Sequence, residues 1–157
     1  MKYTETSNVF IDSNLWIYLS VETNDTSKHE KATHFFERIA NKNIFVSIQV
    51  INEFHWVLLK KYKLPKALIN EKVTNGIIPM SNILPLKLAA YQKANQIRIH
   101  YSVSFWDSLI ISSALLADCS ILYTEDMQNG LVLENQIKII NPFLSQWPSG
   151  LFLTNFS

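Results

Sequence analysis

Short apolar runs and segments of helical spacing alternate along most of this chain. Apolar runs of four or so residues, bounded by polar ones, are typical of strands buried in a parallel sheet. The predicted strands are residues 9–11, 44–47, 121–124 and 136–140, with a further short strand at 77–80. Apolar positions three and four apart predict helices. One predicted helix starts at residue 15, another spans 29–40, and a third follows the strand 44–47 with the apolar residues between 50 and 62 on one face. Further helices run from 65 to about 76, span 86–97 and start after Ser104, and residues 22–28 are a predicted loop.

Strands that alternate with helices predict an α/β fold, a three-layer sandwich around a mostly parallel central sheet. At 157 residues the chain fits a single domain, which we place at residues 1–145. Residues 146–157 form an apolar tail of undetermined role, which docks either on the domain or on a partner. In sheets of this kind, the functional crevice lies outside the carboxyl ends of the strands.

Four acidic residues stand at the borders of apolar runs. Asp12 follows the first predicted strand, Glu53 lies in an early helix, Asp107 opens a late helix, and Asp126 follows a late strand. Burying a carboxylate costs several kcal/mol unless it is paired, hydrogen-bonded or bound to metal. No basic residue lies near them in the sequence to pair with them, so a shared divalent cation is the simplest interpretation.

The order and surroundings of these acids resemble those of the PIN-domain nucleases, and among them the VapC-like toxins of toxin–antitoxin pairs. The resemblance covers residues 9–143. It rests on four short motifs in a fixed order: Asp12-Ser13-Asn14, Asn52-Glu53, Asp107, and Thr124-Glu125-Asp126. Many members of the family carry a further Asp followed by Phe, where this chain has Gln128 and Asn129.

The resemblance implies a PIN-like fold and a metal-dependent endoribonuclease that cleaves RNA phosphodiester bonds. It also implies a toxin that works in the cytoplasm, forms a homodimer and is held by a small antitoxin protein. Mg²⁺ or Mn²⁺ is the expected ion, since hard cations prefer carboxylate oxygens and keep several waters. Asp12, Glu53 and Asp107 are assigned to the principal ion, and Asp126 to a second ion or to a water. Ser13, Asn14 and Thr124 are predicted to orient these carboxylates.

Each acid also has an ordinary explanation. Asp12 and Asp126 are in positions where an aspartate stabilises a turn. Asp107 lies in the first turn of a helix, where the dipole favours a negative charge by about 0.3–1 kcal/mol. Glu125 is an alternative to Asp126 as the fourth acid. The four acids together, and no one of them, carry the functional interpretation.

The composition excludes several classes of protein. Hydrophobic residues are 48% and charged residues 17% of the chain, which is a globular composition. A net charge of +1 is not typical of a stable duplex-DNA binder. A single cysteine excludes an intramolecular disulfide and a cysteine-based zinc cluster. Neither a secretion signal nor a membrane span is visible in the sequence.

Two other functions remain open at this stage. A haloacid-dehalogenase-like phosphatase also begins with an aspartate at a strand end, but its second aspartate two residues later is replaced here by Asn14. The second alternative is a non-catalytic module that keeps the fold and binds RNA or protein. The histidines have no metal-ligand spacing. The basic cluster Lys60-Lys61-Tyr62-Lys63-Leu64-Pro65-Lys66 is either a solvated helix end or a surface that follows a phosphate backbone. Trp16, Trp56 and Trp106 are either core residues or walls of a substrate groove.

Overall fold

The computed structural model describes residues 7–22 and 26–144 of the chain. Six strands form one sheet in the order β3-β2-β1-β4-β6-β5, and every pairing is parallel except that of β5 with β6. The strands are β1 (Asn8–Ile11), β2 (Asn43–Ser47), β3 (Asn82–Leu84), β4 (Ile121–Tyr123), β5 (Val132–Leu133) and β6 (Ile137–Ile140). The predicted α/β fold with a mostly parallel central sheet is confirmed.

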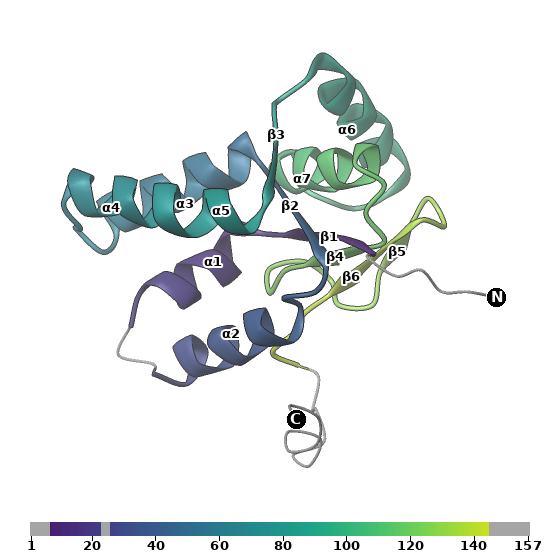
Figure 1. The fold of residues 1–157 in the computed structure, drawn as a ribbon. Coiled ribbons are helices and arrows are strands. Elements are labelled where there is room, and N and C mark those ends of the chain that lie inside the picture. Colours follow the sequence, from purple (N-terminus) through teal and green to yellow (C-terminus); the bar gives the residue numbers. More distant parts are fainter. Residues whose placement is uncertain (1–6, 23–25, 145–157) are drawn as a thin grey trace, which may run out of the picture.

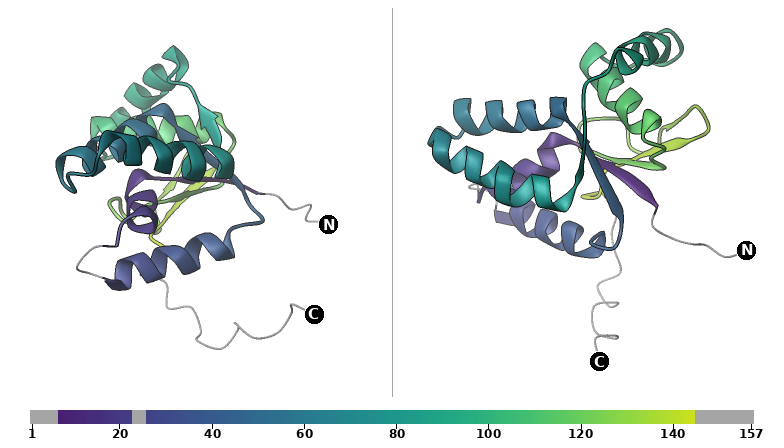
Figure 2. Two further views of the ribbon diagram at one scale, coloured as in Figure 1. Left: turned by 60° about the vertical axis from the view of Figure 1, so that its left-hand side comes forward. Right: turned by 45° about the horizontal axis from the view of Figure 1, so that its top comes forward.

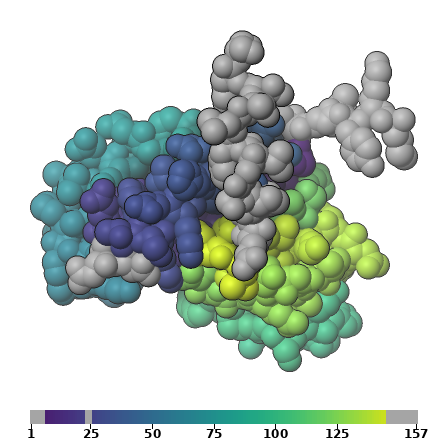
Figure 3. Space-filling view, turned by 90° about the horizontal axis from the view of Figure 1, so that it is seen from below, coloured from purple at the N-terminus to yellow at the C-terminus, as the bar shows by residue number. Residues whose placement is uncertain are grey.

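Helices cover the sheet on both sides (Figures 1 and 2), with α2 on one side and α6 and α7 on the other. The helices are α1 (Ser13–Ser20), α2 (Thr26–Arg38), α3 (Ile48–Lys60), α4 (Lys66–Lys72), η1 (Val73–Ile77), α5 (Ile78–Met80), α6 (Leu88–His100) and α7 (Phe105–Leu116). Seen from below, α2 lies beside the last described strand (Figure 3).

The position of β1 in the middle of the sheet explains why its short sequence is so apolar. Val9, Phe10 and Ile11 are completely buried, because β1 has a neighbouring strand on each side and helices on both faces. The first residue after this strand is Asp12, so the chain leaves the core at a carboxylate.

Two predictions about the middle of the chain are wrong. The helix does not end near Gly76: α4 continues through the π-helical segment η1 into α5 and stops at Met80. The predicted strand at 77–80 is therefore helix, and the third strand is β3, which begins at Asn82. A proline inside a helix clashes with the carbonyl four residues earlier, and the wider π turn at that point makes room for Pro79.

Other differences are smaller. The antiparallel strand β5 was not predicted, since two residues are too few to show a period. Helix α2 begins at Thr26, inside the predicted loop. The single domain predicted for residues 1–145 contains all the described elements, whereas the predicted tail lies outside the described residues. Within the described part of the chain, no helix is both long enough and apolar enough to cross a membrane.

Candidate active site

The site lies at the carboxyl end of β1, where the order in which the chain adds strands to the sheet reverses. From β1 the chain proceeds to β2 on one side, whereas β4 occupies the other side. The carboxyl end of such a strand is where open α/β sheets bind ligands. Asp12 stands at this end, and its backbone N–H donates to the Tyr123 carbonyl of β4 at 3.0 Å. The sheet therefore holds the Asp12 backbone rigidly at the crevice.

Asp12 is a buried carboxylate with two close donors and a third, the Ser13 hydroxyl, at 3.5 Å from Oδ1. The backbone N–H of Ser13 donates to Oδ1 at 2.7 Å, and the Thr124 hydroxyl donates to Oδ2 at 2.8 Å. Only 4% of the residue is exposed. Burial raises the pKa of Asp12 to about 7; the two hydrogen bonds lower it, and the charges of Glu53 and Asp126 raise it further. Burial thus outweighs the donors, and none of the described residues pairs Asp12 with a cation.

Glu53 reaches the same place from α3. The Ser13 hydroxyl donates to Glu53 Oε2 at 3.0 Å and lies 3.5 Å from Asp12 Oδ1, so one hydroxyl stands between the two carboxylates. Gln49, one turn earlier on α3, donates from Nε2 to Glu53 Oε1 at 3.0 Å. The Ser47 hydroxyl accepts from the Val50 N–H and caps this helix, which fixes where Glu53 falls. Gln49 was not predicted as a site residue; its position four residues before Glu53 was the available signal.

Asp107 comes from the first turn of α7, where the Ser104 hydroxyl accepts from its backbone N–H at 3.1 Å. This confirms Ser104 as the predicted N-cap. Burial raises the pKa of Asp107, the Ser104 hydroxyl lowers it, and the charge of Asp126 raises it. Asp107 therefore interacts electrostatically with an acid from a different element, which the helix dipole alone does not explain.

The loop after β4 contains two acids that point to different partners. Asn14 Nδ2 donates to Asp126 Oδ2 at 2.8 Å, and the Asp126 backbone N–H donates to Thr124 Oγ1 at 3.2 Å. Asp126 thereby joins the network of Asp12. Of the two candidates for the fourth acid, Asp126 is the one whose charge acts on Asp12 and on Asp107.

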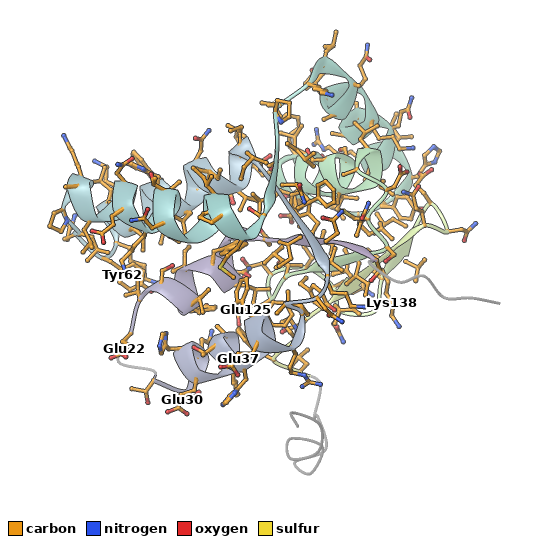
Figure 4. All side chains as sticks on the ribbon, viewed as in Figure 1. Glu22, Glu30, Glu37, Tyr62, Glu125 and Lys138 are labelled. Atoms are coloured by element: carbon orange, nitrogen blue, oxygen red, sulfur yellow. The ribbon has the colours of Figure 1, made fainter. Side chains whose placement is uncertain are left out.

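Glu125 is held elsewhere. Its Oε1 accepts from the Tyr18 hydroxyl at 2.5 Å and from Lys28 Nζ at 2.8 Å, so that α1 and α2 both bind it. In Figure 4 Glu125 lies between these two helices. These two hydrogen bonds hold the side chain of Glu125 apart from the other acidic residues of the site. They also anchor the loop that carries Asp126.

One buried polar atom has no partner at this site. Asn14 Oδ1 accepts no hydrogen bond, although Asn14 is 8% exposed and its Nδ2 donates to both Thr124 and Asp126. A buried carbonyl oxygen without a donor is rare and requires a ligand or a water. Because the Nδ2 of the same amide donates to Asp126, the group lies in an acidic setting, and its oxygen fits a cation or a hydrated cation.

The arrangement is not a closed metal cage. Within residues 7–22 and 26–144, no three or more His, Cys, Asp or Glu side chains converge closely enough to hold an ion by themselves. Mg²⁺ needs no such cage, since it keeps several waters and binds through one or two carboxylates. The donors present are all oxygens, and the charges of Glu53 and Asp126 act on Asp12. The residues therefore fit a hydrated divalent cation.

Two of the three tryptophans differ from their default interpretation as core residues. Trp16 is buried, but Trp56 and Trp106 are 61% and 63% exposed.

Asn129, which stands at a position where many PIN domains differ, accepts a hydrogen bond through Oδ1 from the Asn141 N–H at 2.8 Å, and so connects the loop to the end of β6. It is thus used in the structure of the loop.

Comparison with models of protein families gives a match over most of the chain. The model of the PIN domain matches residues 9–128. No curated protein sequence matches the chain.

Solved structures share the fold at low sequence identity. The Sarcin-Ricin loop cleaving toxin VapC20 of Mycobacterium tuberculosis is 13% identical, with a TM-score of 0.59 over 75% of this chain and 89% of that one. A toxin–antitoxin complex from Klebsiella pneumoniae is 19% identical, with a TM-score of 0.62 over 85% and 97%. DNA-bound VapBC from Salmonella typhimurium is 18% identical, with a TM-score of 0.61 over 85% and 96%. These likenesses agree with the arrangement of strands and helices described above.

Proposed function

We propose that this chain, which belongs to the PIN domain family, is a divalent-metal-dependent endoribonuclease. The observation that carries the proposal is the network at the carboxyl end of β1. Three acids are linked there by shared hydrogen-bond partners: Asp12, Glu53 and Asp126. A fourth acid, Asp107, comes from another helix and is influenced by the charge of Asp126. Family membership removes the support for the haloacid-dehalogenase-like alternative, whose resemblance rested on Asp12 alone.

Mg²⁺ or Mn²⁺ is the proposed cofactor. Asp12, Glu53 and Asp107 are the residues that would hold the principal ion, and the unpartnered Oδ1 of Asn14 supports an ion or its water on that side. A bound divalent cation supplies an activated water and offsets the charge that builds on the phosphate. Asp126 is the proposed residue for a second ion or for the water.

The remaining residues orient these carboxylates. The Ser13 hydroxyl separates Asp12 from Glu53, and Thr124 Oγ1 donates to Asp12 while it accepts from the Asp126 N–H. Such outer partners fix the direction of a ligand's oxygens and are often worth 10–100-fold in metal affinity or activity. Because the pKa of Asp12 is raised to about 7, this carboxyl keeps much of its proton at neutral pH until a cation replaces it.

We further propose that the protein is the toxin of a toxin–antitoxin pair, active in the cytoplasm as a homodimer and inhibited by a small antitoxin. The likeness to the Klebsiella and Salmonella complexes supports this role. Light scattering of the purified chain and co-purification with the product of the neighbouring reading frame test it. A monomer at all concentrations together with no small partner would contradict both parts of the proposal.

Cleavage of single-stranded RNA by the purified protein, with Mn²⁺ and with EDTA, tests the enzymatic function. Asp12→Asn, Glu53→Gln and Asp107→Asn should each abolish cleavage, and Asp126→Asn should have a milder effect if one ion is enough. Asp118→Asn is the matched control, because Asp118 is exposed and lies at the far end of α7. Full activity of Asp12→Asn would refute the assignment. RNA binding without metal-dependent cleavage would establish the alternative of a non-catalytic module.

A further inference from the structure

Two exposed tryptophans lie on either side of Glu53. Trp56 is three residues after Glu53 on the same face of α3, and Gln49 is four residues before it. Gln49 Nε2 also donates to the Trp106 carbonyl at 3.2 Å, which brings the start of α7 against the start of α3 (Figure 1). With a rise of 1.5 Å per residue, Gln49 and Trp56 are about 6 Å and 4.5 Å from Glu53 along the helix axis.

Cations accompany the aromatic rings on both sides. Lys60 Nζ lies 4.9 Å from the centre of the Trp56 ring, and Lys61, Lys63 and Lys66 follow it in exposed positions. On the other side, the Trp106 ring lies 5.3 Å from the Phe105 ring, and the Arg98 guanidinium lies 5.5 Å from the Phe105 ring. Arg98 also lines an open hollow of about 610 Å³ at the end of α6.

Tryptophan side chains are normally buried to a large extent in a protein core. Two tryptophans that are more than 60% exposed near the acidic residues of the site therefore need another explanation. Stacking against bases supplies one, because every base presents a flat face and each stacked base is worth about 1–3 kcal/mol. Positive charge beside the rings is what a phosphate backbone requires, whereas an apolar protein partner would not require it.

We propose that Trp56 and Trp106 are stacking platforms for a single-stranded RNA, which passes over Glu53 between them. Lys60 and Arg98 contact the phosphates on the two sides. The path runs from the lysines at the end of α3, across the carboxylates, to the hollow at the end of α6. The tryptophans are positioning residues that hold unpaired nucleotides on both sides of the bond to be cut. This inference takes its substrate class from the proposed ribonuclease function.

Direct binding tests the path independently of cleavage. Fluorescence anisotropy of a labelled single-stranded RNA of about ten nucleotides is measured in EDTA, so that binding is observed without turnover. Trp56→Ala and Trp106→Ala should each weaken binding by about 5- to 100-fold. Trp56→Phe and Trp106→Phe should recover most of the affinity, because the ring is retained. Lys60→Gln should reduce the dependence of log K on log salt by about 0.7.

Controls separate stacking from general surface effects. Leu116 is also exposed on α7, about 15 Å along the helix from Trp106, so Leu116→Ala should bind RNA like the wild type. A duplex of the same sequence should bind more weakly to the wild type and should not respond to the tryptophan variants. Circular dichroism and thermal melting establish that each variant is folded; if an alanine variant is not, the Phe and Lys60→Gln variants carry the test.

The outcomes divide cleanly between this inference and the proposed function. Wild-type RNA affinity in folded Trp56→Ala and Trp106→Ala variants would overturn the inference. So would variants that change only the size of the assembly or the capture of a small protein partner. In cleavage assays, the tryptophan variants should raise KM and leave kcat near its wild-type value. RNA binding that needs the tryptophans, but with no cleavage in Mn²⁺, would refute the nuclease function and leave this inference intact.

Discussion

Asp12→Asn should stabilise the metal-free protein at neutral pH, and should do so less under mildly acidic conditions. The reason is the pKa of Asp12, which burial raises from 3.8 to about 7 in the folded protein. Between these two values, the unfolded chain has lost the proton that the folded chain still binds. The free energy of unfolding therefore falls as the pH rises, by about 1.4 kcal/mol per pH unit. Above about pH 7 both states are ionised, and the loss is complete.

The magnitude follows from the width of this window. From pH 5 to pH 8, the wild type should lose about 3 kcal/mol of stability through Asp12 alone. Asp12→Asn removes the ionisation and keeps the shape of the side chain, so the difference between the two proteins across the pH range reports the ionisation of Asp12. Its advantage over the wild type should thus grow by about 3 kcal/mol across this range, or roughly 6–12 °C in melting temperature.

The assay is thermal or urea unfolding in EDTA at several pH values between 5 and 8, for the wild type, Asp12→Asn and Asp118→Asn. Asp107, whose pKa is also raised, is present in all three proteins, so that its contribution largely cancels in the differences. The control should follow the wild type, since Asp118 is exposed. Parallel stability curves for the wild type and Asp12→Asn would show that Asp12 ionises in the folded protein without cost, and would refute the reasoning.

Three further predictions concern metal and local structure. Mg²⁺ or Mn²⁺ should raise the melting temperature of the wild type, by the equivalent of about 2.7 kcal/mol at a hundredfold excess over Kd, whereas Asp107→Asn should gain little; equal shifts in the two proteins would place Asp107 outside the metal site. Lys28→Met removes a cation from Glu125 and should destabilise the fold by about 1 kcal/mol, whereas Lys31→Met, also on α2 but exposed, should not; urea unfolding measures both. Ser104→Ala removes the cap of α7 and should cost about 1 kcal/mol in the same assay, with the exposed Ser102→Ala as its control.

The sequence located the acids because their positions follow from simple rules. A run as apolar as Val9-Phe10-Ile11 must be a buried strand, and the residue after a buried parallel strand faces the crevice. The Ser104 cap and the start of α7 were likewise visible in local sequence. The carboxyl-end position of Asp12 and the cap at Ser104 were therefore predictable without any knowledge of tertiary contacts.

What the sequence could not supply depends on contacts between distant elements. Glu125 and Asp126 are equally good candidates for the fourth acid in the sequence. Only the contacts of Glu125 with Tyr18 of α1 and Lys28 of α2 distinguish them. The exposure of Trp56 and Trp106 was missed, since tryptophan normally packs in the core. The helix through Gly76 was missed because a short apolar run does not distinguish strand from helix.

The position of β4 next to β1 also decides when the site comes into existence during synthesis. Thr124 hydrogen-bonds to Asp12, yet it follows Asp12 by 112 residues. At about 5–20 residues per second, a ribosome needs roughly 5–25 s to pass from one to the other. During that interval the emerging chain has one open edge of β1 and lacks both Thr124 and Asp126. A product that stops before β4 would therefore lack two members of the network, and the network at the carboxyl end of β1 can form only after residue 126 has been synthesised.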